Sequence, residues 1–240
     1  MIIEGRNSVY EALNSKVTFN KLMINKTAPA QDIIDMARQR GIKVDFVDKK
    51  VLDKESRTNN HQGMIAYVTD FQYCDVEDIL DVAKAKGKDP FIVLLDGIED
   101  PHNLGSIIRV CEGAGVDGVI IEKQRACPVN ETVVKVSAGA ITHMKIARVP
   151  NLNSVIKMLK DNNIWVYGCE LGGKDVYSCK LTGPIALVIG SEGNGISRLT
   201  RELCDEVVTL PMFGKVNSLN ASTAASVFVY EVVRQRIKND

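Results

Sequence analysis

Residues 91–121 read FIVLLDGIEDPHNLGSIIRVCEGAGVDGVII, and this stretch decides the fold class. It opens with a continuous apolar run at residues 91–95, which is typical of a strand covered on both faces. A polar turn and a helical segment follow, and a second apolar run lies at residues 116–121. Two buried strands joined by a helix predict a parallel sheet with helices on both faces.

The rest of the chain after residue 91 repeats this alternation. Further apolar runs lie at residues 164–166, 185–189 and 207–210, with helical segments between most of them. A final helix is predicted for residues 222–238. We therefore expect one α/β domain over residues 91–240, with its ligand sites in the loops that follow the strands.

The first seventy residues have a different pattern and predict a separate small α/β domain, residues 1–73. Short strands are expected at residues 21–25, 42–47 and 64–68, and a helix at residues 31–40 is stopped by Gly41. Ser8 and Glu11 fit a capping box that opens an earlier helix. Residues 74–90 hold a helix capped by Asp75 and the polar stretch KAKGKDP, and we interpret this segment as the linker.

Composition excludes several classes of protein. The 240 residues are 45% hydrophobic and 25% charged, as in ordinary globular domains, and no apolar run reaches the length of a membrane span. The first residues lack a signal-peptide pattern, so we expect a cytoplasmic protein with no membrane partner. The charges balance, 30 basic against 30 acidic, which neither indicates nor excludes a local nucleic-acid site.

The metal-binding residue types are scattered. The six cysteines form no CxxC pair and the three histidines have no ligand spacing, so no metal site is predicted. Most cysteines stand beside apolar residues and are expected to be buried thiols.

The loop after residues 91–95 carries Asn103 and Arg109. Asn103 is placed to cap the following helix, and Arg109 comes six residues later, so both can face one site near the helix start. A guanidinium at such a place suits a phosphate or a carboxylate. A capped helix with a surface arginine satisfies the same spacing.

The loop after residues 185–189 reads GSEGNG, residues 190–195, with Glu192 in its middle. Its three glycines indicate that something approaches the backbone closely. It is neither a dinucleotide fingerprint nor a phosphate loop. A carboxylate here suits an adenosine or amino-acid ligand better than a phosphate, although a tight turn with a solvated glutamate explains the pattern equally well.

The third loop, residues 211–222, reads PMFGKVNSLNAS and enters the last helix. Asn220 and Ser222 are both possible caps of that helix. Capping does not explain why all three polar loops fall at strand ends.

Three segments together resemble the SpoU (TrmH-like) family of RNA methyltransferases. They are DGIEDPHNLGSIIRVCEGAGVDGVII, LVIGSEGNGISRLTRELCDEVVTLPM and VNSLNASTAASVFVYEVVRQR, in the family's order and near its spacing. EGRNSVYEAL and HQGMIAYV also resemble the small substrate-binding domain of the bacterial subgroup that modifies large-subunit ribosomal RNA.

The resemblance implies a fold that composition does not: a parallel-sheet SPOUT domain with a C-terminal deep trefoil knot, preceded by an L30e-like domain. It also implies a homodimer with the active site near the subunit interface, S-adenosylmethionine as methyl donor, no metal, RNA as partner and no role for DNA. The expected activity is 2′-O-methylation of a ribose, in 23S rRNA at a guanosine.

The family's site residues are expected at matching positions. The catalytic set is Asn103, Arg109, Glu192, Ser218 and Asn220, and the donor-binding set is Gly190, Leu210, Met212 and Leu219. One departure is visible, since Ala221 follows Asn220 where relatives often have valine. We expect Arg109 to clamp a phosphate and stabilise developing alkoxide charge, because a guanidinium stays protonated.

The small domain is expected to dock RNA by shape and phosphate contacts. Its candidate contacts are Arg6, Lys16, Lys21, Lys26 and Arg57. Two other functions remain open at this point: a tRNA 2′-O-ribose methyltransferase, and a catalytically inactive RNA-binding or ribosome-assembly protein. A dinucleotide-dependent oxidoreductase is disfavoured because no strand is followed by GxGxxG.

Overall fold

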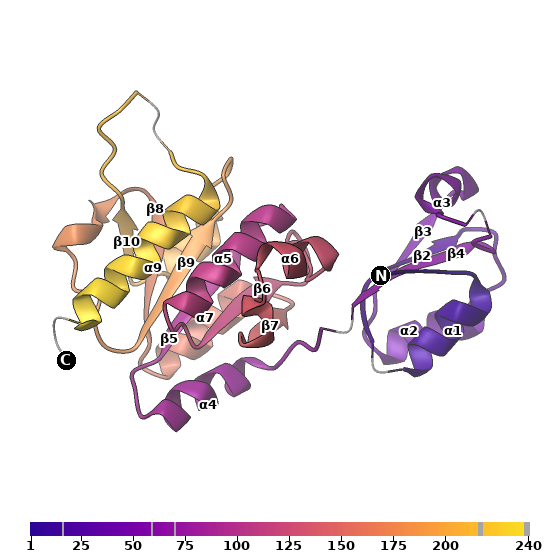
Figure 1. Ribbon diagram of the computed structural model, residues 1–240, viewed down its shortest axis with the longest axis horizontal. Helices are drawn as coiled ribbons and strands as arrows, with labels where there is room; N and C mark the ends of the chain where they lie inside the picture. The colour runs from indigo at the N-terminus through magenta and orange to yellow at the C-terminus, as the bar shows by residue number, and fades with distance from the viewer. Residues whose placement is uncertain (16, 59, 70, 216–217, 238–240) are drawn as a thin grey trace. The chain divides into compact units, whose positions relative to one another are not determined.

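The computed structural model describes residues 1–15, 17–58, 60–69, 71–215 and 218–237 (Figure 1). The chain divides into two compact units. The smaller contains Met1–Gln72 with Val129–Glu131, and the larger contains Tyr73–Pro128 with Thr132–Asp240.

The smaller unit is built on a four-stranded mixed sheet of order β1-β4-β2-β3. Its elements are β1 (Ile2–Glu4), α1 (Arg6–Asn14), β2 (Thr18–Asn25), α2 (Gln31–Gln39), β3 (Val44–Val47), α3 (Lys49–Glu55) and β4 (Met64–Thr69). β2 runs parallel to β3 and antiparallel to β4. Apolar residues of α1 and α2, such as Val9 and Ile33, share one core with Leu22 and Ala66 of the sheet.

The larger unit is built on a six-stranded sheet of order β10-β8-β9-β5-β6-β7. All its strand pairs are parallel, as the continuous apolar runs predict. Its strands are β5 (Phe91–Asp96), β6 (Gly118–Glu122), β7 (Ile146–Val149), β8 (Trp165–Asp175), β9 (Ile185–Gly190) and β10 (Glu206–Thr209). Its helices are α4 (Val76–Lys86), α5 (Pro101–Gly113), α6 (Glu131–Val136), α7 (Leu152–Asp161), α8 (Arg198–Leu203) and α9 (Ala221–Ile237), with short 3-10 turns η1 (Ala140–Thr142) and η2 (Val176–Ser178).

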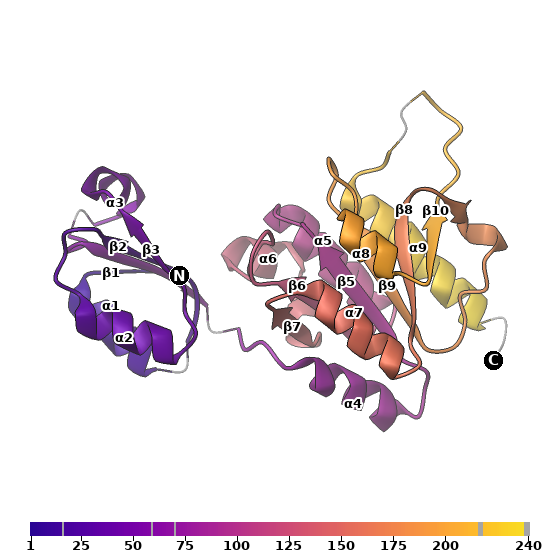
Figure 2. The same cartoon turned by 180° about the vertical axis from the view of Figure 1, so that it is seen from behind.

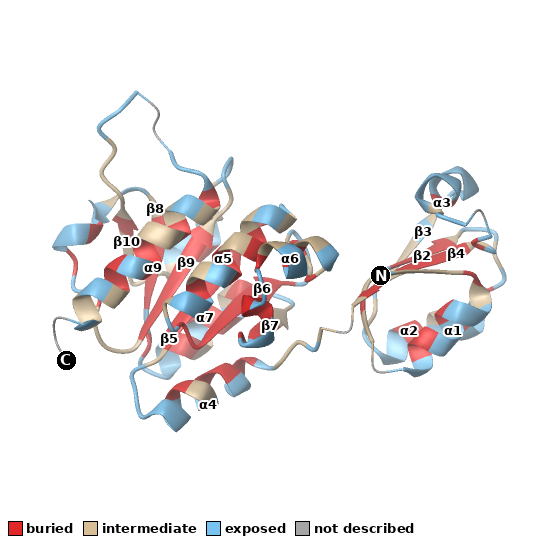
Figure 3. Ribbon diagram, viewed as in Figure 1, coloured by how far each residue is buried: buried red, intermediate tan, exposed pale blue. Residues whose placement is uncertain are grey.

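Helices cover both faces of the large sheet. α5 and α9 lie side by side over one face (Figure 1), and α7 and α8 lie over the other (Figure 2). The central strands β5 and β9 are buried except at Gly190, the last residue of β9, whereas the helices are buried only on their inner sides (Figure 3). This confirms the α/β fold with a parallel sheet, and it brings the loops after β5 and β9 together, since those strands are neighbours.

α4 falls within the segment expected to form a linker, residues 74–90, but it is packed into the larger unit. Val76, Ile79 and Leu80 belong to the core that α7 forms with Ile92 and Ile120 of the sheet. An apolar helix face that can be buried on a sheet is stabilised there rather than left in water. The larger unit therefore begins before residue 91.

Two local predictions are corrected by the structure. α1 begins at Arg6 after Gly5, so Ser8 lies inside the helix and does not open it. The side chain that caps α5 is Asp100, which accepts hydrogen bonds from the backbone N–H groups of His102 and Asn103, both at 3.2 Å. Asn103 therefore lies in the first turn of α5, which leaves its side chain for other contacts.

Across the described ranges, no helix combines the length and the apolar character that crossing a membrane requires.

Candidate active site

Three loops meet beyond the carboxyl ends of the parallel strands. The first follows β5, and the second follows β9, whose last residue Gly190 is paired with Asp96 of β5. The third leads from β10 to α9. Polar groups placed at this edge of a parallel sheet are where ligands of such folds bind.

Asn103, Glu192 and Asn220 form a hydrogen-bonded cluster that joins these loops. Asn103 Nδ2 donates to Glu192 Oε1 at 2.9 Å, and Asn220 Nδ2 donates to Asn103 Oδ1, also at 2.9 Å. Asn220 Nδ2 donates to Glu192 Oε1 as well. One carboxylate oxygen thus accepts from two amides that are 117 residues apart in the chain. The structure brings together three of the five predicted catalytic residues.

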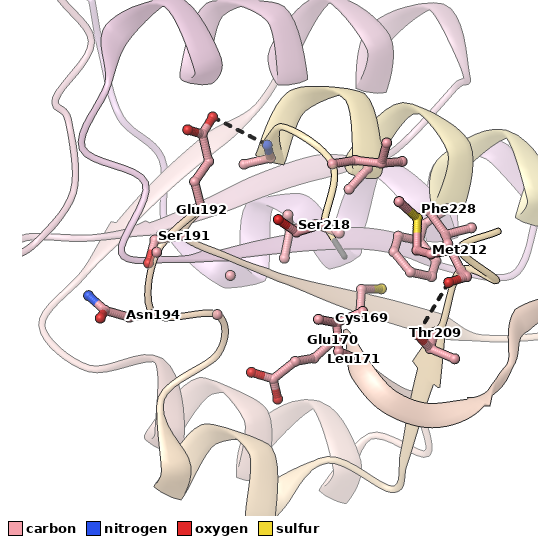
Figure 4. Close-up of a pocket in the computed structure, with 18 of the residues that line it drawn as sticks. Cys169, Glu170, Leu171, Ser191, Glu192, Asn194, Thr209, Met212, Ser218 and Phe228 are labelled. Carbon is pink, nitrogen blue, oxygen red and sulfur yellow. Dashed lines mark hydrogen bonds between the residues drawn. The ribbon is translucent and has the colours of Figure 1, made fainter. Parts of the chain in front are cut away.

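Asn220 also caps α9. Its Oδ1 accepts hydrogen bonds from the backbone N–H groups of Ser222 and Thr223, at 3.0 and 3.2 Å. The N–H of Ala221 lies 3.4 Å from Glu192 Oε1, and Figure 4 shows Glu192 directed at the start of this helix. A carboxylate at a helix N-terminus is stabilised by the unpaired N–H groups there. Of the two caps considered from the sequence, the structure uses Asn220.

A cavity of about 530 Å³ lies beside this cluster (Figure 4). All four residues of the predicted donor-binding set line it, together with two of the predicted catalytic set: Gly190, Leu210, Met212, Leu219, Glu192 and Ser218. Ile189, Cys169 and Phe228 supply apolar surface, and Glu170 and Asn194 supply polar groups. Its volume and mixed lining are typical of a site for a small organic ligand.

The GSEGNG loop forms one wall of the cavity because its glycines allow a tight closure. Ser191 and Gly195 exchange backbone hydrogen bonds of 3.1 and 2.9 Å. A Cβ atom at Gly190 would collide with the backbone of Gly195, and Gly195 itself has φ of 62°. The close approach expected at these glycines is therefore made by the loop itself.

Arg109 lies apart from the cluster. Its side chain is exposed on α5, and neither the 530 Å³ cavity nor the cavity beside Asn103 has it in its lining. Six residues of helix amount to a rotation of about 240° from Asn103, which turns Arg109 to another side. Within one chain, the expectation that both residues face one site is wrong.

The cysteines are free thiols and most are buried, as predicted. Burial raises the pKa of Cys204 to about 12 and that of Cys127 to about 11. The pKa of Cys169 in the cavity wall is also raised, through burial first and the neighbouring Cys204 second. Neutral thiols are poor nucleophiles, so these groups serve as apolar surface. Among the described residues, no group of His, Cys, Asp or Glu is arranged to hold a metal ion.

The predicted RNA contacts of the smaller unit have different environments. Arg6 is engaged within the unit by Asp32 and the Pro29 carbonyl, and Lys26 pairs with Asp48 at 3.1 Å. Lys21 and Arg57 are exposed. Lys16 lies outside the described residues.

The fold, the site and the relatives of this chain define an RNA methyltransferase. The SpoU rRNA Methylase family matches residues 90–230, and the family described as RNA 2′-O ribose methyltransferase substrate binding matches residues 2–74. The chain therefore belongs to the SpoU rRNA methylase family.

Its relatives match along nearly the whole chain. A putative TrmH family tRNA/rRNA methyltransferase, YacO of Bacillus subtilis strain 168, is 42% identical over 97% of this chain and 94% of its own length. A protein of the same description from Staphylococcus saprophyticus is 44% identical over 98% and 96%.

Solved structures agree. The SpoU methyltransferase AviRb of Streptomyces viridochromogenes, in complex with the cofactor AdoMet, is 27% identical with a TM-score of 0.64, over 99% of this chain and 91% of that one. A putative RNA methyltransferase of the TrmH family from Porphyromonas gingivalis is 25% identical with a TM-score of 0.60, over 98% of this chain and 89% of that one.

Proposed function

We propose that this protein transfers a methyl group from S-adenosylmethionine to the 2′-oxygen of a ribose in RNA, and that the acceptor is a guanosine of 23S rRNA. The observation that carries the proposal is the 530 Å³ cavity bordered by Glu192, whose carboxylate is held by Asn103 and Asn220. A ligand pocket and a fixed polar cluster adjoin at the strand ends, where transfer between two substrates needs them.

The cavity fits the donor by its chemistry. S-adenosylmethionine combines an apolar purine with a ribose and two cationic groups, the sulfonium and the ammonium. Met212, Leu219 and Phe228 offer apolar contacts, and the carboxylates of Glu170 and Glu192 suit the cations or the ribose hydroxyls. When bound, the donor supplies a methyl group already activated for attack.

The residues of the chain would then position the acceptor. A ribose hydroxyl is a weak nucleophile, so holding it in line with the methyl group accounts for much of the rate enhancement. Asn103 and Asn220 are fixed through Glu192 and are suited to orient the ribose or the donor, with Ser218 beside them. Arg109 would clamp the neighbouring phosphate and stabilise negative charge on the attacking oxygen.

The exposed position of Arg109 supports a homodimer. Arg109 lines neither cavity of its own chain, and in a homodimer it could reach the site of the partner across the subunit boundary. We include in the proposal that α5 lies at this boundary. We also include a deep trefoil knot at the C-terminus of the larger unit, which the match of residues 90–230 to the SpoU rRNA Methylase family supports.

The smaller unit would dock the RNA and the larger unit would carry out the reaction. Lys21 and Arg57 are exposed and suited to phosphate contacts. The proposed division follows the substrate-binding match at residues 2–74 and the methylase match at residues 90–230.

Tritium transfer from labelled S-adenosylmethionine to unmodified 23S rRNA, 16S rRNA and bulk tRNA tests this function. We expect label on 23S rRNA, at one guanosine whose 3′ linkage resists alkaline cleavage. Label on tRNA alone would support the proposed reaction but show that its substrate is tRNA and not 23S rRNA. The relatives are described as tRNA/rRNA methyltransferases, which is consistent with either substrate. No label on any RNA, with binding of S-adenosylhomocysteine intact, would favour an RNA-binding protein without catalysis.

A further inference from the structure

A second cavity, of about 360 Å³, lies next to the donor cavity within the larger unit. The loops after β5, β6 and β9 contribute to its lining, through residues such as Glu99, Arg125 and Ser197. β5 and β9 are adjacent in the sheet, but the chain leaves β5 toward β6 and β7 on one side and returns to β9 from β8 on the other. The cavity thus lies at the point where the strand order reverses, which is where open parallel sheets bind ligands.

The two cavities share a wall. Ser191, Glu192, Gly193, Asn194, Gly195 and Ala221 line both of them. Asn103 lines the second cavity and donates to Glu192 at 2.9 Å. A group placed in the second cavity is therefore separated from the donor cavity only by the loop that carries Glu192.

The far side of the second cavity is fixed in place. Cys127 N donates to Ile98 O at 2.8 Å and ties the loop after β6 to the loop after β5. Arg125 has φ of 55°, a left-handed conformation that non-glycine residues adopt where surrounding structure imposes it. Its Nη2 donates to Glu122 Oε2 at 3.1 Å, and the Glu122 side chain is only 8% exposed. One edge of the guanidinium is anchored, and the Arg125 side chain is still 65% exposed.

The polar groups of the second cavity fall into two sets. Asp96 accepts from Ser197 N at 2.8 Å, and Asp100 caps α5, so both carboxylates are used by the protein. Glu99, by contrast, is exposed, and no hydrogen bond or ion pair of its side chain occurs among the described residues. Glu192, in the shared wall, is held by Asn103 and Asn220. Among the described residues of the lining, the cavity therefore offers a ligand one carboxylate that the protein does not use, at Glu99, and one anchored guanidinium, at Arg125.

We infer that this second cavity receives the base of the nucleotide whose ribose is methylated, and that Glu99 and Arg125 recognise it as guanine. The inference rests on the proposed function and names the residues that would determine its specificity. Enzymes that act on a nucleotide read an unstacked base through hydrogen bonds to its edges.

The chemistry of the two side chains selects the base. A carboxylate accepts two parallel hydrogen bonds, and a guanidinium donates two. Guanine has adjacent donors, N1–H and N2–H, on one edge and adjacent acceptors, O6 and N7, on the other, which arginine binds bidentately. Adenine, cytosine and uracil have no pair of adjacent donors for the carboxylate.

The test compares Glu99→Gln with the wild-type protein on RNA carrying guanosine or inosine at the methylated position. Inosine lacks the N2 amino group, and glutamine keeps the size of glutamate but offers one acceptor and one donor. We expect wild-type kcat/KM to fall by about 10-fold or more from guanosine to inosine. Glu99→Gln should lose a similar factor on guanosine RNA and lose little more on inosine RNA, while the Kd for S-adenosylhomocysteine stays within about twofold.

The matched control is Glu77→Gln, an exposed glutamate on α4 outside both cavities, which should behave as wild type. If Glu99→Gln methylates both RNAs as wild type does, the inference is overturned while the proposed function stands. Methylation of a nucleotide other than guanosine, or none on any RNA, overturns both.

Discussion

The first helix of the smaller unit begins after a glycine, and its cap comes from a distant residue. Gly5 has no side chain to offer, and the backbone N–H of Arg6 donates instead to Gln62 Oε1 at 3.1 Å. Both residues have positive φ, 89° for Gly5 and 47° for Gln62. The EGR segment, residues 4–6, and the HQG segment, residues 61–63, are thus joined by this hydrogen bond. The spacing of the two segments in the sequence does not reveal it.

Replacing Gln62 by alanine should remove this cap. Losing a helix N-cap typically costs about 1 kcal/mol, so we expect a lower midpoint for unfolding of the smaller unit. Gln62→Glu keeps the acceptor oxygen and should remain near wild type. Denaturant unfolding followed by amide signals of α1 gives the measurement, and equal midpoints for the alanine and glutamate variants would contradict the capping role.

Glu4 makes the smaller unit sensitive to acid. Hydrogen bonds from the Ser56 hydroxyl first, then from the Thr58 hydroxyl and the Arg57 and Thr58 backbone N–H groups, lower the pKa of Glu4 to about 2 from its usual 4.5. A carboxyl whose pKa is lower in the folded state stabilises the fold above the pKa of the unfolded chain. That contribution is lost as the pH falls from about 4.5 to about 2.

Glu4→Gln should therefore be less stable than wild type at pH 7 and should lose less on acidification. Denaturation midpoints of both proteins between pH 7 and pH 2.5 would measure the difference. Parallel pH curves for the two proteins would show that Glu4 does not carry the effect.

Arg109 permits a test of its proposed role. A phosphate clamp depends on the planar, bidentate guanidinium, which the point charge of lysine does not reproduce. Arg109→Lys should lose most methyl transfer at every pH and keep its affinity for S-adenosylhomocysteine. If Arg109→Lys were active with a different pH optimum, residue 109 would instead accept the proton of the ribose hydroxyl. Single-turnover rates across pH distinguish the two.

α4 is a packed helix that ends in a polar, linker-like stretch of sequence. Ile79 is fully buried and lies on Gly118 of β6, where the space of a glycine side chain is filled by the isoleucine. The polar KAKGKDP stretch that suggested a linker begins only in the last turn of this helix. Charged residues in the last turn of a helix do not indicate whether the earlier turns have a buried apolar face, as α4 does.

Ile79→Ala should destabilise the larger unit by about 2–5 kcal/mol, as large-to-small changes in a close-packed core do. Asp81→Ala on the exposed side of the same helix should change stability by less than about 0.5 kcal/mol. Thermal unfolding of the three proteins supplies the comparison. A negligible effect of Ile79→Ala would mean that α4 is not part of the cooperative unit.

The sequence predicted most elements of the large sheet because its strands are covered on both faces. Continuous apolar runs identify β5, β6, β8, β9 and β10 without any knowledge of their neighbours. β1 of the smaller unit has only three residues. The apolar run of β7 is interrupted by Arg148, so it gives no continuous pattern. The cap of α5 was misassigned because two residues capable of capping, Asp100 and Asn103, stand three positions apart.

The positions of the three sequence motifs predicted which residues of the folded molecule lie close together. They did not predict the hydrogen bonds between those residues. Gly190, Leu210, Met212 and Leu219 line one cavity. The hydrogen bonds that join residues 103, 192 and 220 depend on the order of strands in the sheet, which a linear pattern does not contain. The second cavity was missed for the same reason, since Glu99 and Arg125 follow different strands.

The lining of the donor cavity comes wholly from the larger unit. We therefore expect a fragment starting at Tyr73 to bind S-adenosylhomocysteine within about threefold of the full chain and to lose methyl transfer to RNA, because the smaller unit would dock the substrate. Isothermal titration of both proteins checks the binding. Loss of donor binding in a folded fragment would show that the cavity depends on the smaller unit.

The hydrogen bonds of Asn220 with Glu192 and Asn103 have a consequence for synthesis of the protein. Ala224 and Phe228 of α9 also line the donor cavity, so part of it is made by residues that a ribosome adds after all the strands of the large sheet. Domains generally fold from the N-terminus while the chain is still growing. The smaller unit can fold early, but a nascent chain that still lacks α9 has neither these two lining residues nor the contact of Ala221 N with Glu192. We therefore expect a chain that lacks α9 to be unable to bind S-adenosylhomocysteine.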